Sequence, residues 1–91
     1  MYNLKLLDCT LRDGGYINDW RFGYENIRDI VRSLVKAGTD IVEVGFLRNV
    51  DYDPDCTRWN TVAELKKILP ADRKNVMFSG MALHNFYDID K

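Results

Sequence analysis

Two kinds of hydrophobic pattern alternate along this chain, and this alternation limits the possible folds more than any other feature. Short apolar runs at residues 3–8, 40–46 and 76–83 have the length of strands, and the middle run is rich in β-branched residues. Between them, residues 24–37 carry apolar side chains at helical spacing, and residues 61–69 carry a second, shorter set. The order strand, helix, strand, helix, strand predicts an α/β fold with three parallel strands.

Local signals place the ends of both helices. Gly38 follows the first helical stretch and can supply the left-handed residue that commonly ends a helix. Thr61 and Glu64 have the spacing of a capping box, in which each side chain accepts a hydrogen bond from a backbone N–H group. The intervening residues 9–23 and 47–59 are mostly polar and are expected to be loops.

The predicted sheet is incomplete as a domain. Two helices can cover only one face of three strands, and both edges of the sheet stay open. A complete (β/α)8 barrel has roughly 250 residues, whereas this chain has 91. We therefore expect residues 1–91 to be the amino-terminal portion of a truncated TIM barrel, and we expect the isolated chain to self-associate. The residues expected to face the barrel interior are Leu6, Val42, Val44 and Met77 or Phe78.

Composition excludes several classes of function. The chain has 13 basic and 14 acidic residues with neither sign gathered in a block, so nucleic acid and anionic membranes are not expected partners. Its longest charge-free stretch, residues 76–87, is too short and polar to span a membrane, which takes about 20 apolar residues. The aspartates of residues 51–55 begin like a calcium-binding loop but lack its glycine and glutamate. Cys9 and Cys56 have no metal-ligand spacing, and so few cysteines fit a reducing, cytoplasmic setting.

The segment DCTLRDGG, residues 8–15, carries the residues best suited to chemistry. It puts Arg12 and Asp13 directly beyond the carboxyl end of the first strand, where parallel α/β folds bind ligands. Asp13 offers a hard oxygen ligand for Mg²⁺ or Mn²⁺, and Arg12 offers a permanent charge with a rigid donor fork for a carboxylate or enolate oxygen. Gly14 and Gly15 let the backbone turn sharply. The simpler alternative is a surface arginine and aspartate beside a glycine turn.

The same segment resembles the signature of the hydroxymethylglutaryl-CoA lyase-like family of metal-dependent aldolases and lyases, which includes the 4-hydroxy-2-oxovalerate aldolases. That signature is an Asp, two small or hydroxyl residues, then Leu, Arg, Asp and Gly, matched here by residues 8–14. Residues 41–46, IVEVGF, are similar to the family's second strand and put Glu43 at its acidic position. Ala37, Gly38 and Asp40 also fit, so the resemblance runs over most of the chain.

The resemblance implies that Asp13 is a ligand of a divalent metal and that Arg12 stabilises an enolate. It implies that Glu43 faces the substrate in the barrel mouth; pairing with a neighbouring cation is the alternative. The implied full-length enzyme cleaves or forms a carbon–carbon bond of a 2-oxo acid or hydroxy-oxo acid through a metal-stabilised enolate. The alternatives are an acyl-CoA-dependent Claisen synthase and a metabolite-binding barrel without turnover. The isolated chain is expected to be inactive.

Two departures from the family pattern bear on the mechanism. The 4-hydroxy-2-oxovalerate aldolases have a catalytic histidine where this chain has Tyr16, so a phenol or another group must transfer the proton. The family completes its metal site with a His-x-His pair on a later strand, whereas His84 is the single histidine of this chain and receives no role here. Tyr16, Trp20 and Phe22 either line a substrate pocket or pack the loop against the sheet.

Overall fold

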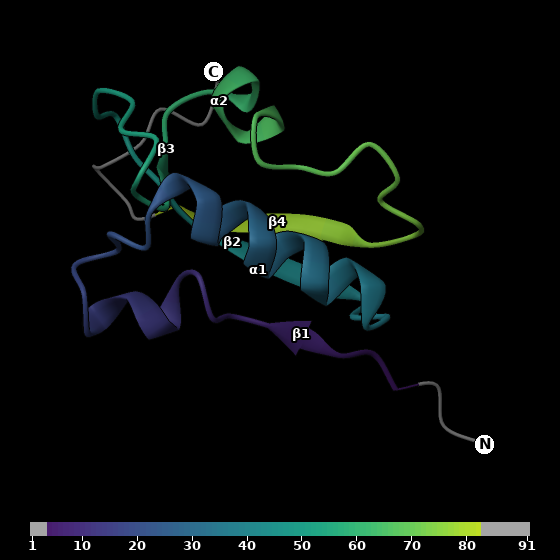
Figure 1. Ribbon diagram of the computed structural model, residues 1–91. Coiled ribbons are helices and arrows are strands. Elements are labelled where there is room, and N and C mark those ends of the chain that lie inside the picture. The colour runs from purple at the N-terminus through teal and green to yellow at the C-terminus, as the bar shows by residue number, and fades with distance from the viewer. Residues whose placement is uncertain (1–3, 83–91) are drawn as a thin grey trace.

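The strand β2 (Ile41–Leu47) is the centre of the fold (Figure 1). In the computed structural model, which describes residues 4–82, each of the other strands pairs with β2 in parallel. The remaining elements, in chain order, are β1 (Leu7–Asp8), the 3₁₀ turn η1 (Asp13–Tyr16), α1 (Tyr24–Lys36), β3 (Arg58–Trp59), α2 (Val62–Lys66) and β4 (Met77–Ala82). The predicted α/β class with parallel strands is confirmed.

The described sheet has four strands rather than the predicted three, because β3 forms inside the expected loop. β4 runs beside β2 along its length, so β1 and β3 share the other edge. β1 pairs with the beginning of β2, and β3 takes over where Phe46 pairs with Arg58. A strand of two residues carries no readable period, which is why the sequence pattern did not predict it.

Gly45 lets β3 approach β2. The pairing of β2 with β4 shifts register between Glu43 and Phe46, and Gly45 lies in that irregularity with a φ of +132°. A Cβ atom at Gly45 would collide with the backbone carbonyl oxygen of Thr57, the residue just before β3. Glycine meets both demands, the unusual φ and the close approach of a second backbone.

The other predicted boundaries hold within a few residues. The helix α1 is confirmed, and Gly38 ends it with a φ of +82°. The strand expected at residues 3–8 is reduced to β1, although the carbonyl of Leu6 still accepts hydrogen bonds from the N–H groups of Asp40 and Ile41. The helix expected at residues 61–69 ends at Lys66. The last residue of the strand expected at 76–83 lies outside the described residues.

The capping box of α2 forms as predicted, with one difference of partner. The N–H of Glu64 donates to the Thr61 hydroxyl at 3.3 Å. The Glu64 carboxylate accepts from the N–H of Asn60 at 2.9 Å, one residue earlier than the box prescribes.

The hydrophobic core lies on one face of the sheet, beneath both helices. In Figure 1, α1 crosses in front of β2 and β4. Its buried side chains belong to the same hydrophobic cluster as Val42 and Val44 of β2. The fully buried members of this core are Leu11, Ile27, Val31, Val35, Val42, Val44, Trp59 and Ile68.

This core corrects the prediction of which residues face away from the helices. Val42 and Val44 are buried in the core and Phe78 packs against it, so these three side chains face α1 rather than a barrel interior. Met77 is exposed and pairs with Ile41 on the opposite face, as predicted, whereas Leu6 is exposed just before β1 and belongs to neither face of the sheet. The prediction was wrong for β2 because a strand that is apolar on both faces does not reveal which face the helices cover.

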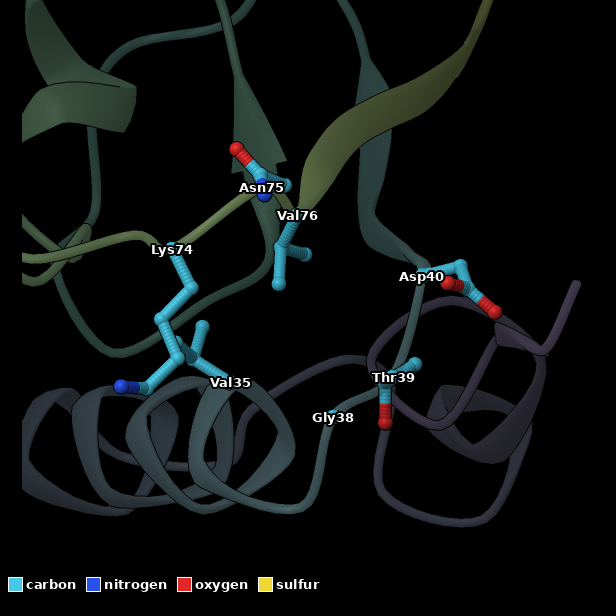
Figure 2. A pocket seen from close by; sticks show the side chains of 7 residues that line it. All are labelled: Val35, Gly38, Thr39, Asp40, Lys74, Asn75 and Val76. Atoms are coloured by element: carbon cyan, nitrogen blue, oxygen red, sulfur yellow. The ribbon is translucent and has the colours of Figure 1, made fainter.

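A small pocket marks the amino-terminal end of the sheet. It measures about 220 Å³ and lies between the end of α1 and the turn that precedes β4 (Figure 2). Its lining residues are Val35, Gly38, Thr39, Asp40, Lys74, Asn75 and Val76. The Asp40 carboxylate already accepts a hydrogen bond from the N–H of Leu6 at 2.7 Å. Ligands of parallel α/β folds bind at the opposite, carboxyl end of the strands, so this pocket is not the expected functional site.

Candidate active site

A tight turn after β1 places Arg12 and Asp13 at the carboxyl end of the sheet. The carbonyl of Cys9 accepts hydrogen bonds from the N–H groups of Arg12 and Asp13 at 3.0 and 2.7 Å. The Asp8 carboxylate accepts from the N–H and the hydroxyl of Thr10, which fixes the first residues of the turn. The side chain of Leu11 is fully buried and anchors the turn in the core.

Arg12 is held by Glu43 of β2. The Arg12 Nε–H donates to Glu43 Oε1, and the two side chains are only 19% and 12% exposed. The hydrogen bond from Arg12 to Glu43, followed by the charge of that carboxylate, raises the pKa of the guanidinium. Glu43 is therefore paired with a cation, which is the alternative that the sequence left open, and that cation is the candidate enolate-binding residue.

Asp13 stands at the edge of this pair. Its side chain is 71% exposed, and Arg12 Nη1 lies 3.7 Å from its Oδ1. Within residues 4–82, no three His, Cys, Asp or Glu side chains come together in a group that could hold a metal ion. Asp13 fits a divalent cation as one anionic oxygen ligand, but the described residues do not complete a metal site.

The predicted aromatic residues take different positions. Tyr16 ends η1 and is 65% exposed. Trp20 packs edge-on against both Tyr16 and Phe46, with ring centroids 4.8 and 5.1 Å apart. Phe22 packs against the core. Trp20 and Phe22 therefore hold the loop to the sheet, which was the second of their two predicted roles, and Tyr16 is left at the surface.

Three residues that sequence reasoning missed support this loop from residues 55–58. The Thr57 hydroxyl donates to the carbonyl of Leu11 at 2.7 Å. Arg58 donates to the carbonyl and carboxylate of Asp19. The Asp55 carboxylate accepts from the N–H of Tyr24 at 3.0 Å and so caps α1. These contacts join loops distant in sequence; the one local signal for them was Gly45 in the interior of a strand.

The remaining candidate residues lie apart from this site. His84 is outside the described residues. Neither Cys9 nor Cys56 forms a disulfide, and burial raises the pKa of the Cys56 thiol. Asp53 pairs with Arg21 at 2.9 Å, and the N–H of Asp55 and then Arg21 lower its pKa.

The longest helix between residues 4 and 82 is α1, with 13 residues, and none in that range is long and apolar enough to cross a membrane.

Comparison with known proteins gives one consistent result. The chain is 44% identical over 41 residues to a 4-hydroxy-2-oxovalerate aldolase of Geobacillus genomosp. 3. It is 38% identical over 42 residues to 4-hydroxy-2-oxovalerate aldolase 6 of Rhodococcus jostii (strain RHA1), and 45% identical over 40 residues to the aldolase of that name from Roseiflexus sp. (strain RS-1). The chain resembles the 4-hydroxy-2-oxovalerate aldolases over a fragment.

The extent of this likeness is limited on both sides. The matched stretch is 44–46% of this chain and 12% of the length of each aldolase. No family model matches the chain. No solved structure matches it.

Proposed function

We propose that this chain is the amino-terminal part of a (β/α)8-barrel aldolase that uses a divalent metal to cleave or form a carbon–carbon bond of a 2-oxo acid. The observation that carries the proposal is the Arg12–Glu43 pair at the carboxyl end of a parallel sheet, with Asp13 beside it. The likeness to 4-hydroxy-2-oxovalerate aldolases over a fragment of their length supports both an aldolase reaction and a chain that forms only part of a barrel. Below, the complete protein means the polypeptide that contains this chain and the rest of the barrel.

Arg12 is suited to bind an oxyanion in one orientation. Its guanidinium has five N–H donors, and Glu43 takes the one on Nε. The remaining donors belong to the two Nη atoms and can bind the carboxylate of a 2-oxo acid or the oxygen that becomes the enolate. Because Glu43 fixes the plane of the guanidinium before substrate arrives, little reorganisation is needed as the negative charge develops.

Asp13 would be one ligand of the Mg²⁺ or Mn²⁺ ion, and the other ligands would come from outside the described residues. When bound, such an ion polarises the 2-oxo carbonyl of the substrate. Asp13 is exposed and its contact with Arg12 is long, so its carboxylate is available to a cation. The Glu43 carboxylate is hydrogen-bonded to Arg12, so it acts on substrate only by positioning that residue.

In the cleavage direction, the 4-hydroxyl of a 4-hydroxy-2-oxo acid loses its proton as the bond between carbons 3 and 4 breaks. The electron pair of that bond becomes the enolate of the 2-oxo acid product, and carbon 4 leaves as an aldehyde. We propose that Tyr16 passes the hydroxyl proton to solvent, its phenol releasing its own proton to water as it takes up that of the substrate, since Tyr16 follows Arg12 and Asp13 on the same loop with its side chain at the surface. We expect a reducing, cytoplasmic setting, which a chain with two cysteines fits.

The direct test uses the complete protein with 4-hydroxy-2-oxovalerate as substrate. Release of pyruvate is followed after removal of metal by a chelator and again after addition of Mn²⁺. We expect cleavage that stops with chelation and returns with Mn²⁺. Condensation only with an acyl-CoA thioester would identify a Claisen synthase instead, and binding of 2-oxo acids without turnover would identify a metabolite-binding barrel.

A further inference from the structure

Trp20 occupies a conformation that its own contacts must maintain. Trp20 and the preceding Asp19 have φ angles of 59° and 55°, in the left-handed region that residues other than glycine rarely adopt. Such a backbone persists where the surrounding structure determines it more than once. The N–H of Trp20 donates to the carbonyl of Gly15 at 2.9 Å, and its own carbonyl accepts from the N–H of Thr57 at 3.0 Å.

The indole of Trp20 reaches back to the backbone of Arg12. Its Nε1–H donates to the Arg12 carbonyl at 2.6 Å, and its ring lies between Tyr16 and Phe46. Gly15 leaves room for the ring, because a Cβ atom at that position would collide with the indole. Both ends of η1 are thereby tied to one side chain.

Arg58 contacts both the Trp20 indole and the preceding residue, Asp19. The guanidinium of Arg58 lies over the Trp20 ring, 5.3 Å from its centroid. The same guanidinium donates to the carbonyl and the carboxylate of Asp19 at 3.0 and 2.8 Å. Since Arg58 belongs to β3, the position of the Arg12 loop is set by the sheet.

We propose that Trp20 is the positioning residue of the candidate active site: its indole N–H holds the Arg12 carbonyl and so keeps the Arg12 guanidinium on Glu43, aimed where the enolate forms. This inference rests on the proposed function. Residues 13–19 are exposed except for Gly15. The Arg12 carbonyl accepts one further hydrogen bond, from the N–H of Gly15 at 3.2 Å, so we expect loss of the shorter indole hydrogen bond to loosen the loop. A site loosened in this way loses rate rather than affinity, because precise geometry matters most in the transition state.

The test replaces Trp20 by Phe, which keeps an aromatic ring and removes the N–H donor. The matched control is Trp59→Phe, because the Trp59 indole also donates to a backbone carbonyl, that of Val44 at 2.9 Å, but lies in the core. In the complete protein we expect Trp20→Phe to lower kcat about tenfold and to leave KM within about twofold. Trp59→Phe should lower the unfolding temperature and leave kcat unchanged.

A second measurement does not depend on activity. Hydrogen exchange of the Arg12 Nε–H, followed by NMR in the complete protein labelled with nitrogen-15 arginine, reports whether Glu43 still holds it. Trp20→Phe and Gly15→Ala should both speed this exchange, whereas Trp59→Phe should not. Gly14→Ala is a further control, since a Cβ atom there meets only a methyl group of Thr10 at 3.8 Å.

The two measurements separate the two proposals. Absence of aldolase activity in the wild-type protein would refute the proposed function, while the exchange measurement would still decide the role of Trp20. Exchange of the Arg12 Nε–H at the wild-type rate in Trp20→Phe would overturn the inference. Faster exchange with an unchanged kcat, or with a raised KM alone, would overturn it as well.

Discussion

The guanidinium of Arg12 lies between two carboxylates that it contacts very differently. Glu43 is partly buried and hydrogen-bonded to it, whereas Asp13 is exposed and 3.7 Å away. An exposed ion pair such as Arg12–Asp13 contributes little to stability, about 0–1 kcal/mol. The two carboxylates are therefore free to have separate roles, Glu43 in orienting Arg12 and Asp13 in binding a cation.

Replacement of Asp13 by Asn tests the second role. A neutral amide replaces an anionic ligand, so we expect the complete protein to bind Mn²⁺ at least about tenfold more weakly, the loss that even outer-shell changes cause. Its stability should stay within about 0.5 kcal/mol of wild type, because the side chain is exposed. Titration calorimetry measures the affinity, with Asp72→Asn as the control: Asp72 is also exposed and 3.8 Å from a cation, that of Lys74. Unaltered affinity in Asp13→Asn would place the metal elsewhere.

Cys56 predicts how stability depends on pH. Burial, then the charge of Asp53, raises the pKa of its thiol above the ordinary value of 9.0. A group whose pKa is raised by folding stabilises the folded state below its ordinary pKa and loses that contribution as the pH rises. We expect the free energy of unfolding to fall above about pH 9, and to fall less in Cys56→Ala. Identical alkaline curves for the two proteins in urea titrations would show that another group, such as Tyr52, is responsible.

The sequence predicted the helices and strands that have a regular hydrophobic period, and it missed the contacts that have none. The helical spacing of residues 24–37 and the strand-like run at 40–46 correspond to α1 and β2. The motif at residues 8–15 placed Arg12 and Asp13 beyond β1, where the structure has them. β3 and the contacts of Thr57 and Arg58 escaped prediction, because they join segments distant in the chain and follow no period.

Substitution of Gly45 tests whether this glycine allows β3 to pair with β2. Gly45→Ala adds a Cβ atom that collides with the Thr57 carbonyl, at a φ of +132°. Gly38→Ala is the matched control, because its φ is +82° and nothing lies within 4 Å of the added atom. We expect Gly38→Ala to cost about 1 kcal/mol and Gly45→Ala roughly 2–4 kcal/mol, since only Gly45→Ala must also displace β3. Equal shifts of the two variants in urea unfolding would contradict this account of β3.

Within residues 4–82, helices cover one face of the sheet and leave the other open. Both helices pack on one face of the sheet, and the other face carries exposed apolar side chains such as Leu7 and Met77, which lie in register on either side of Ile41. β1 and β4 each use one edge in pairing with β2, and no further strand between residues 4 and 82 pairs with the other edge of either. In a complete barrel, further strands would cover this face and pair with these edges.

We therefore expect the 91-residue chain on its own to self-associate, covering its exposed apolar face or pairing its strand edges with another copy. Sedimentation velocity over a wide dilution series should show a mass that rises with concentration, and the dye ANS should bind the dilute protein. A monomer that persists at high concentration without binding the dye would mean that these residues close their own core and that the incomplete barrel is wrong.

If Arg12 stabilises the enolate, steady-state kinetics of Arg12→Ala in the complete protein will show the loss of that stabilisation. We expect kcat to fall roughly 10²–10³-fold, with a much smaller change in KM, because the charge of Arg12 is needed mainly as the enolate forms. Arg73→Ala, in the turn before β4 at the other end of the sheet, should behave as wild type. An unchanged kcat with only a raised KM would assign Arg12 to substrate binding alone and rule out its role in stabilising the enolate.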